Sequence, residues 1–285
     1  AATTTTTTTS TTTTTTTTTT TIAAKVRKER TFVVKTAVVL KETVFYPDGL
    51  VDEYTLFSYD PTMQKLLSRA SYDPSRVDPV EKVLSEYGAS GKLAAEVTYG
   101  SDGSLKSRRE VAWSEDKNYP DLLLSERGLD AKNQVQYSST YEYDKAGHRS
   151  AWRAFDAKGA LKATTTYTYD AKGRLLLIEL RNGANVGTGS IKVEYSADGN
   201  SEKRSYLAAD GSLQKFEVTL QKDGKASRFE IHRADGSLAE VSDYTLGPLG
   251  ERLATATTDG AGKVREKKSA EYAVREDQKI EVYYE

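Results

Sequence analysis

The sequence predicts an all-β protein, built as a long antiparallel up-and-down β-meander in an extended or curled sheet. Three observations predict this fold. A turn signature recurs almost to the C-terminus, its copies are mostly 12 to 14 residues apart, and polar and apolar residues alternate between them. Each interval therefore has room for one strand but not for a strand and a helix together.

The turn signature is clearest at Asp170-Ala171-Lys172-Gly173. These residues match a type I turn followed by a bulge, because Asp suits the first position and Gly the left-handed fourth position. Asn133 occupies one fourth position, and Asn also tolerates a positive φ. The predicted fourth positions from residue 88 onward are Gly91, Gly103, Asn133, Gly147, Gly159, Gly173, Gly199, Gly211, Gly224, Gly236, Gly250 and Gly262.

Two intervals are doubled, from residue 103 to 133 and from 173 to 199, and each is predicted to hold an irregular turn. These turns are expected near Asp116–Pro120 and at Asn182-Gly183. Alternation between turns supports the strands: residues 161 to 169 place Leu, Ala, Thr and Tyr on one face, and Lys and Thr on the other. The run Leu175–Ile178 breaks the alternation and predicts a strand buried on both faces.

The chain divides into three predicted parts: a Thr-rich low-complexity segment at 1–24, a less regular β region at 25–87, and the repetitive meander at 88–285. Residues 1–21 are Ala and Thr with one Ser. They are open to three interpretations: an exported stalk acting as a tether, an artificial or placeholder segment, or a β-strand. Residues 80–87 suit a short helix or a strand, and a strand is predicted.

Composition narrows the function classes. Hydrophobic residues make up 37% of the chain, and 18 Tyr outnumber 6 Phe, a mixture that suits thin sheets with a wet face. Lys and Arg (40) balance Asp and Glu (41), so no basic field indicates a nucleic-acid partner. Cysteine is absent from the sequence, and no apolar run is long enough to predict a transmembrane helix.

Candidate chemistry is sparse. His148 and His232 are the only histidines, and their spacing matches no metal-binding motif. The recurring Asp residues are explained by turn capping, and Asp223-Gly224 and Asp235-Gly236 lack the tandem rhythm of calcium-binding repeats. The sequence therefore predicts no enzyme, no catalytic residue, no metal site and no cofactor.

The candidate partner-binding residues are aromatic. They could form a cross-strand ladder, and they are Trp113, Tyr141, Tyr143, Trp152, Tyr167 and Tyr169. Two interpretations stand. The rings pack one sheet face, at roughly 0.2–1 kcal/mol per pair, or they form an exposed strip that recognises sugar, peptide or lipid.

Two stretches, Tyr141–Arg149 and Tyr167–Leu175, resemble the YD (Rhs) repeat family, whose motif is Tyr-x-Tyr-Asp followed by two residues, Gly and Arg-Leu. The resemblance covers under a tenth of the chain. It implies a secreted or envelope β-sheet protein whose repeats build a shell or adhesive surface without catalysis. The repeat spacing is shorter than in the family, and the chain is too short for a closed cocoon, which favours a short envelope scaffold over a toxin carrier.

The leading hypothesis is a non-enzymatic scaffold or binding protein of the cell envelope (periplasm or outer surface), or a secreted one, that presents a sheet surface to a protein or glycan partner. The alternative is a carrier whose curled sheet holds an apolar ligand, which Leu175–Ile178 favours. The charged residues of Gly262–Glu285 either guard a terminal edge strand or leave it to associate with another chain.

Overall fold

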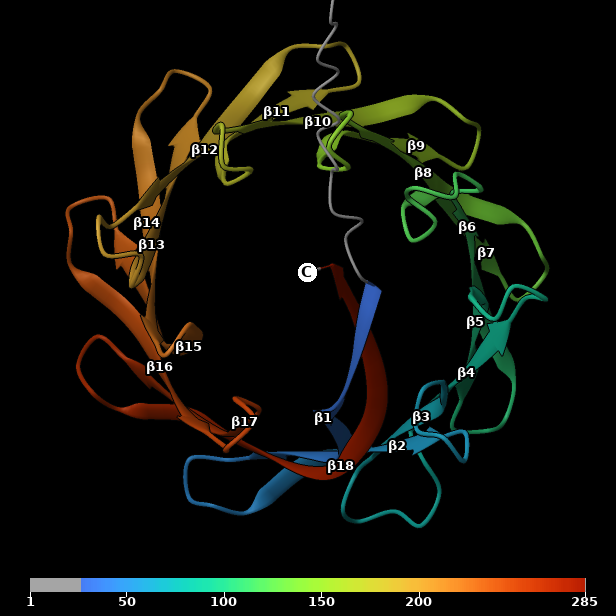
Figure 1. Cartoon of the computed structure of the whole chain (residues 1–285). Coiled ribbons are helices and arrows are strands. Elements are labelled where there is room, and N and C mark those ends of the chain that lie inside the picture. The colour runs from blue at the N-terminus through green and yellow to red at the C-terminus, as the bar shows by residue number, and fades with distance from the viewer. Residues whose placement is uncertain (1–26, 285) are drawn as a thin grey trace, which may run out of the picture. The chain divides into compact units, whose positions relative to one another are not determined.

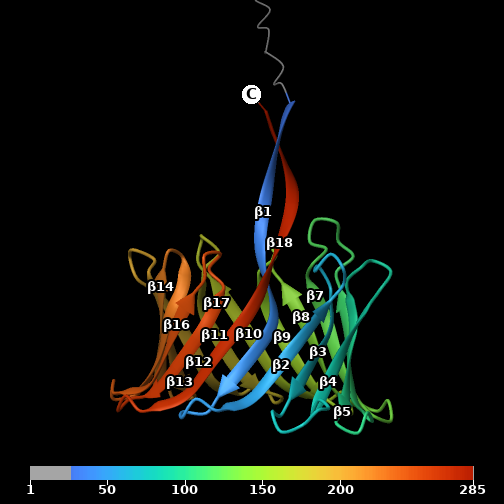
Figure 2. The same cartoon turned by 90° about the horizontal axis from the view of Figure 1, so that it is seen from below.

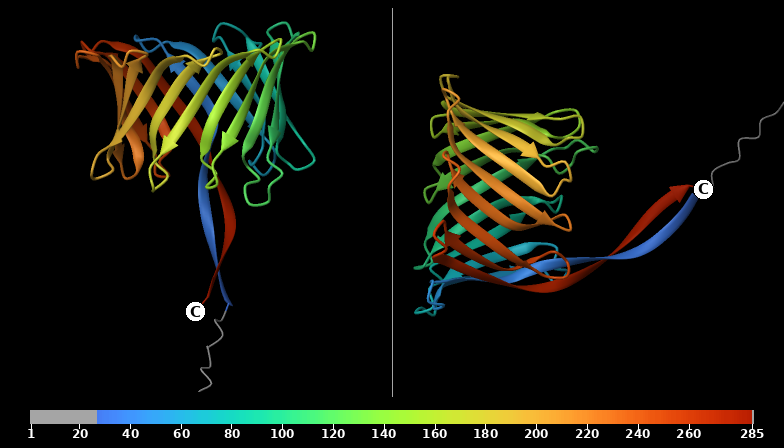
Figure 3. Two further views of the ribbon diagram at one scale, coloured as in Figure 1. Left: turned by 90° about the horizontal axis from the view of Figure 1, so that it is seen from above. Right: turned by 90° about the vertical axis from the view of Figure 1, so that its left-hand side faces the viewer.

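The computed structural model describes residues 27–284, and the predicted Thr-rich segment 1–24 lies outside the described residues. The chain forms two compact units. One comprises residues 35–275, and the described part of the other comprises residues 27–34 and 276–284. In the smaller unit, the outer ends of the first and last strands lie side by side (Figures 2 and 3).

The larger unit is an antiparallel β-barrel (Figure 1). Every strand pairs with the next one along the chain, and the last also pairs with the first, which closes the ring. The strands are β1 (Arg27–Phe45), β2 (Val51–Tyr59), β3 (Leu66–Tyr72), β4 (Glu81–Tyr87), β5 (Leu93–Gly100), β6 (Leu105–Trp113), β7 (Leu123–Asp130), β8 (Val135–Tyr143), β9 (Arg149–Asp156), β10 (Leu161–Tyr169), β11 (Leu175–Asn182), β12 (Gly187–Tyr195), β13 (Ser201–Ala208), β14 (Leu213–Lys222), β15 (Lys225–Arg233), β16 (Leu238–Leu246), β17 (Arg252–Asp259) and β18 (Val264–Tyr284).

The predicted all-β up-and-down meander is confirmed, and its sheet curls until it closes. The strands are tilted relative to the barrel axis, as closure of a sheet requires (Figure 3). The strand predicted over residues 80–87 is present as β4, Glu81–Tyr87, and the strands of regions 25–87 and 88–285 belong to the same sheet. Residues 27–284 contain no helix that is long and apolar enough to cross a membrane.

The turns have the expected chemistry. Gly173 and Asn133 have φ values of 76° and 59°, the left-handed conformation predicted for the fourth position. The carboxylate of Asp170 accepts hydrogen bonds from the backbone N–H groups of Lys172 and Arg174, both at 2.9 Å. The predicted turn at Asn182-Gly183 is also present. Side-chain capping and a left-handed residue therefore close the hairpins together.

Two expectations were wrong. Asp223 and Gly224 both have positive φ (51° and 71°), so this hairpin is a two-residue turn and Gly224 is not the fourth residue of a type I turn. Leu175–Ile178 is not buried on both faces, since Leu176 is 38% exposed and its three neighbours are half-buried. The barrel wall is one sheet thick, so neither face of β11 lies under a second layer.

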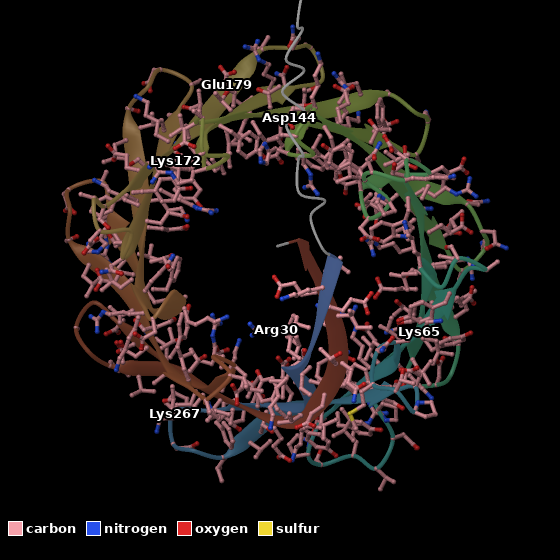
Figure 4. All side chains as sticks on the ribbon, in the orientation of Figure 1. Arg30, Lys65, Asp144, Lys172, Glu179 and Lys267 are labelled. Carbon is pink, nitrogen blue, oxygen red and sulfur yellow. The ribbon has the colours of Figure 1, made fainter. Side chains whose placement is uncertain are left out.

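The two faces of the wall can be assigned from the strand register. Glu179 of β11 and Lys267 of β18 point away from the barrel axis (Figure 4). Thr166 of β10 is the partner of Glu179, so its neighbours Thr165 and Tyr167 face inward. The registers carry this alternation around the ring.

The barrel has no deep apolar core. Its buried hydrophobic residues are mostly Val and Ala, and none of the large side chains within the described part of the chain is less than 2% exposed. Barrels of 16 to 18 strands are wide enough to enclose water rather than a packed interior. The inner wall of this barrel is therefore a wet surface rather than the lining of a dry core.

Candidate ligand-binding site

The barrel brings the six predicted aromatic residues together on its inner wall. They belong to β6, β8, β9 and β10, where β8, β9 and β10 are adjacent and β7 separates β6 from β8. Tyr141 is directly paired with Trp152, and Trp152 with Thr165. We call this surface the aromatic wall, and its residues are Trp113, Tyr141, Tyr143, Trp152, Tyr167 and Tyr169. It occupies one side of the ring, between β6 and β10 (Figure 1).

Three of the six residues are the last residues of their strands, and each side chain donates a hydrogen bond to a backbone carbonyl at the rim of the barrel. The indole N–H of Trp113 donates to the carbonyl of Leu93 at 2.7 Å. The hydroxyl of Tyr143 donates to Leu123 at 2.7 Å, and that of Tyr169 donates to Arg149 at 2.9 Å. The polar atoms of these three residues thus already have hydrogen-bond partners within the protein. The three residues therefore have a structural role at the rim.

Basic or imidazole side chains also cover aromatic rings at strand ends on this rim, both within the aromatic wall and beyond it. We call four such contacts the rim pairs. The Nζ atoms of Lys65 and Lys92 lie 5.3 and 5.9 Å from the ring centroids of Tyr87 and Trp113, the Arg174 guanidinium lies 4.8 Å from that of Tyr195, and the His148 ring stacks on Tyr169 at 4.9 Å. Each pair links the end of one hairpin turn to the next strand end on that rim.

Tyr141, Trp152 and Tyr167 lie further along their strands, on the wall itself. Tyr141 sits beside a charged network in which Arg109 bonds to Glu96 at 2.9 Å and to Glu126 at 2.6 and 2.9 Å. Partial burial, followed by the charge of Glu126 and its hydrogen bond, raises the pKa of Tyr141 to about 12. The wall thus combines aromatic faces with fixed polar groups.

Arg149 is a member of this surface that the sequence did not single out. A β-bulge at the start of β9 places it opposite Tyr143, and its guanidinium lies 4.6 Å from the centroid of the Tyr141 ring. Burial lowers the pKa of Arg149, but its hydrogen bonds with Tyr167 and Tyr143 outweigh that effect, so its pKa is raised. Arg149 is the second residue after Gly147, the glycine of a YD-like turn, and this position was the available signal.

An open groove lies beside the aromatic wall. It has a volume of about 610 Å³ and is lined by Tyr141, Tyr143, Ser150 and residues of the loop 114–122. In that loop the hydroxyl of Tyr119 donates to the carbonyl of Lys145 at 2.8 Å, which fixes the loop against the β8–β9 turn. This loop is the irregular turn predicted near Asp116–Pro120, within the doubled interval from residue 103 to 133. Longer loops on rigid scaffolds often carry function.

The two histidines lie apart. His148 is on the rim, 3.1 Å from the carboxylate of Asp144, whereas His232 faces outward, 2.9 Å from Glu230 and stacked on Phe216 at 4.5 Å. Among residues 27–284, no group of three or more His, Cys, Asp or Glu side chains is arranged to hold a metal ion.

Comparisons with known proteins leave the family open. No protein-family model matches the chain, and no curated protein sequence does either. Similar solved structures include a porin-like protein from Bacteroides uniformis (10% identity, 88% of this chain and 98% of that chain covered, TM-score 0.42). A porin-like protein from Bacteroides vulgatus has 10% identity, with 84% and 99% of the two chains covered and a TM-score of 0.33.

A third similar structure is TcdB2-TccC3 without its hypervariable C-terminal region, with 13% identity and a TM-score of 0.27. The match covers 79% of this chain but only 15% of that one. TM-scores below 0.5 establish neither a shared fold nor a shared function. The YD-repeat resemblance therefore stays a prediction.

Proposed function

We propose that the protein is a non-enzymatic binding protein of the cell envelope, or a secreted one, whose barrel takes a glycan against its aromatic wall. The observation that carries the proposal is the convergence of six aromatic residues from β6, β8, β9 and β10 on one stretch of the inner surface, next to an open groove. The C–H faces of sugar rings pack well against aromatic faces, and the neighbouring polar groups supply hydrogen-bond partners.

The outer wall supports a barrel surrounded by water. On the outside of β4 to β7, Arg108 bonds to Glu86 at 2.7 Å and to Glu110 at 3.0 Å, and Arg127 bonds to the same Glu110 at 2.6 Å. Charged Arg or Lys on the lipid face of a barrel costs about 2–4 kcal/mol at the bilayer midplane. This ion-pair network suits an aqueous surface, in keeping with a periplasmic, outer-surface or secreted location.

The inner wall disfavours the apolar-ligand carrier that the sequence left open as an alternative. Charged side chains such as Arg109, Glu126, Arg204 and Glu202 face the interior and pair there. Burying an apolar molecule against such groups would remove water from charges without replacing it. A polar ligand that keeps part of its hydration fits the surface better.

Ring closure also favours a glycan over a peptide that adds a strand. All the strands of residues 35–275 have neighbours on both sides, so this unit offers no free edge for an incoming strand. The edge association anticipated for the charged C-terminal strand is thereby restricted to the smaller unit, residues 27–34 and 276–284. Recognition inside the barrel has to rely on side chains.

The proposal can be tested by glycan-array screening of the full chain, followed by calorimetric titration of the best ligand against variants. Trp152→Ala should weaken binding by about tenfold or more, because it removes a large aromatic face from the wall. Phe155→Ala is the matched control, since Phe155 is an aromatic residue on the outer face of the same strand and is paired with Ser138. Absence of glycan binding, or equal losses in both variants, would refute the proposal.

A further inference from the structure

We infer that the glycan taken by the aromatic wall is anionic, and that Arg149 binds its acidic group. This inference rests on the proposed function and adds a ligand class and a specificity-determining residue to it. The acidic group is a carboxylate, as in a uronic acid, or a sulfate. Both present coplanar oxygen pairs that a guanidinium can engage with two hydrogen bonds.

The two inner-face arginines of this part of the barrel differ in whether a carboxylate pairs with them. Arg109, the other inner-face arginine between β6 and β10, is held by both Glu96 and Glu126. Arg149 instead has an aromatic face and two tyrosine hydroxyls around it, and within the described residues no carboxylate forms an ion pair with it. A half-buried cation whose neighbours are neutral lowers its energy when an anion binds.

The guanidinium is also held in place before any ligand arrives. It lies over the Tyr141 ring and interacts with the hydroxyls of Tyr167 and Tyr143. Its backbone is fixed because the Arg149 carbonyl accepts the hydroxyl of Tyr169 at 2.9 Å. Little side-chain entropy is lost when an anion binds to a side chain that is already ordered. Trp152 pairs with Tyr141, the residue whose ring lies under the guanidinium, and so adds a second aromatic residue to this part of the wall.

A second arginine provides a matched control. Arg252 begins β17 as Arg149 begins β9, its guanidinium lies 3.6 Å from the centroid of the Tyr244 ring, and its carbonyl accepts the hydroxyl of Tyr272 at 3.0 Å. It thus shares the ring contact and the bonded carbonyl of Arg149, but it is exposed and lies outside the aromatic wall. Substituting the exposed Arg252 should cost no more stability than substituting Arg149, and only the Arg149 substitution should weaken binding.

The test uses the full chain and titrates short uronic-acid oligomers and their methyl esters, together with sulfated and unmodified neutral oligomers of the same backbones. We expect the acidic oligomers to bind at least about tenfold more tightly than their neutral counterparts. Arg149→Gln should abolish that preference, Arg149→Lys should restore part of it, and Arg252→Gln should leave it unchanged. Comparing the uronate and sulfate series identifies which acidic group is preferred.

The failures of the two proposals are distinguishable. Equal binding of acidic and neutral oligomers, with no effect of Arg149→Gln, would overturn the anionic ligand while leaving glycan binding intact. Equal losses from Arg149→Gln and Arg252→Gln would overturn the assignment of Arg149. Binding of an acidic peptide such as polyglutamate in place of every oligomer, or no binding at all, would overturn this inference and the glycan function together.

Discussion

The two sides of the barrel share most of their turn chemistry but finish their strand ends differently. On the side of β4 to β12, which we call the aromatic half, strand ends on one rim carry an aromatic residue that bonds to a carbonyl 20 or 21 residues earlier. These residues are Tyr87, Trp113, Tyr143, Tyr169 and Tyr195. In the plain half, β13 to β17, the corresponding places hold Gln221 and Leu246.

The difference shows which features make the sheet and which are added to it. The backbone bonds that close the turn 247–251 in the plain half (2.8 and 3.0 Å) match those of the turn 170–174 in the aromatic half (2.9 and 3.0 Å). The same turn therefore closes hairpins in both halves, with or without an aromatic residue at the strand end. The aromatic residues brace one rim and create the inner surface that we propose for ligand binding.

The largest expected effect is a loss of stability when a rim aromatic residue is removed, compared with the same truncation in the plain half. Tyr169→Ala removes a half-buried ring, its stacking on His148 and its hydrogen bond to Arg149, and should lower the free energy of unfolding by about 2–3 kcal/mol. Leu246→Ala at the corresponding place should cost about 1 kcal/mol, because no ring stack or hydrogen bond is lost. Urea denaturation of both variants measures the contrast, and equal losses would mean that the rim contacts add nothing.

A gain of stability should follow when the missing contact is supplied. Lys225 precedes Leu246 by 21 residues, the spacing of three of the four rim pairs, and both side chains line one groove. Leu246→Tyr should therefore place a ring under an existing cation and a hydroxyl near the carbonyl of Ala226. We expect a gain of about 0.5–1 kcal/mol in urea denaturation.

Two controls sharpen that experiment. Leu246→Phe should recover the cation–ring contact without the hydrogen bond, and so give a smaller gain. Adding Lys225→Ala to Leu246→Tyr should remove the part of the gain that depends on the cation. If Leu246→Tyr destabilises the protein, the two halves differ in backbone position at the rim as well as in sequence.

The sequence predicted the strands because the relevant information is local. Each Asp-x-x-Gly turn specifies its own reversal, and alternation specifies which residues share a face, so all-β architecture and strand order follow from neighbouring residues. Closure into a barrel did not follow, because it depends on the tilt and twist summed over all strands. Nothing in Leu175–Ile178 itself reveals that a single-layered wall would leave both of its faces half-exposed.

The candidate site was predictable only in part. The six aromatic residues could be placed on one face from strand parity, but the sequence does not say whether that face is inside or outside. Arg149 was not recognised, since strict alternation would place it on the face opposite Tyr143, and the bulge that reorients it appears only in the paired strands. The Arg109–Glu126 network was missed because its members are 17 residues apart and meet only across a strand pair.

The smallest expected effect concerns the turns that both halves share. Asp170→Ala removes the oxygen that accepts two backbone N–H bonds and should lower the melting temperature, whereas Asp170→Asn should lower it much less. Asn182 demonstrates the amide alternative, since its side-chain oxygen accepts the same pair of bonds from Ala184 and Val186 at 3.0 Å. Calorimetry on the two variants checks the ranking, and equal losses would assign the effect to the lost charge.

Acid should weaken the same turns. In the aromatic half, the backbone N–H of Arg174, followed by its side chain and the N–H of Lys172, lowers the pKa of Asp170 below that of the unfolded chain. In the plain half, the hydroxyl and N–H of Ser237 lower the pKa of Asp235. A carboxylate with a depressed pKa contributes stability above its unfolded pKa, near 4, and loses that contribution as the pH falls through its folded value. The melting temperature should therefore decrease when the pH is lowered below about 4. The decrease should be smaller in Asp170→Asn, which has no charge to lose at that turn.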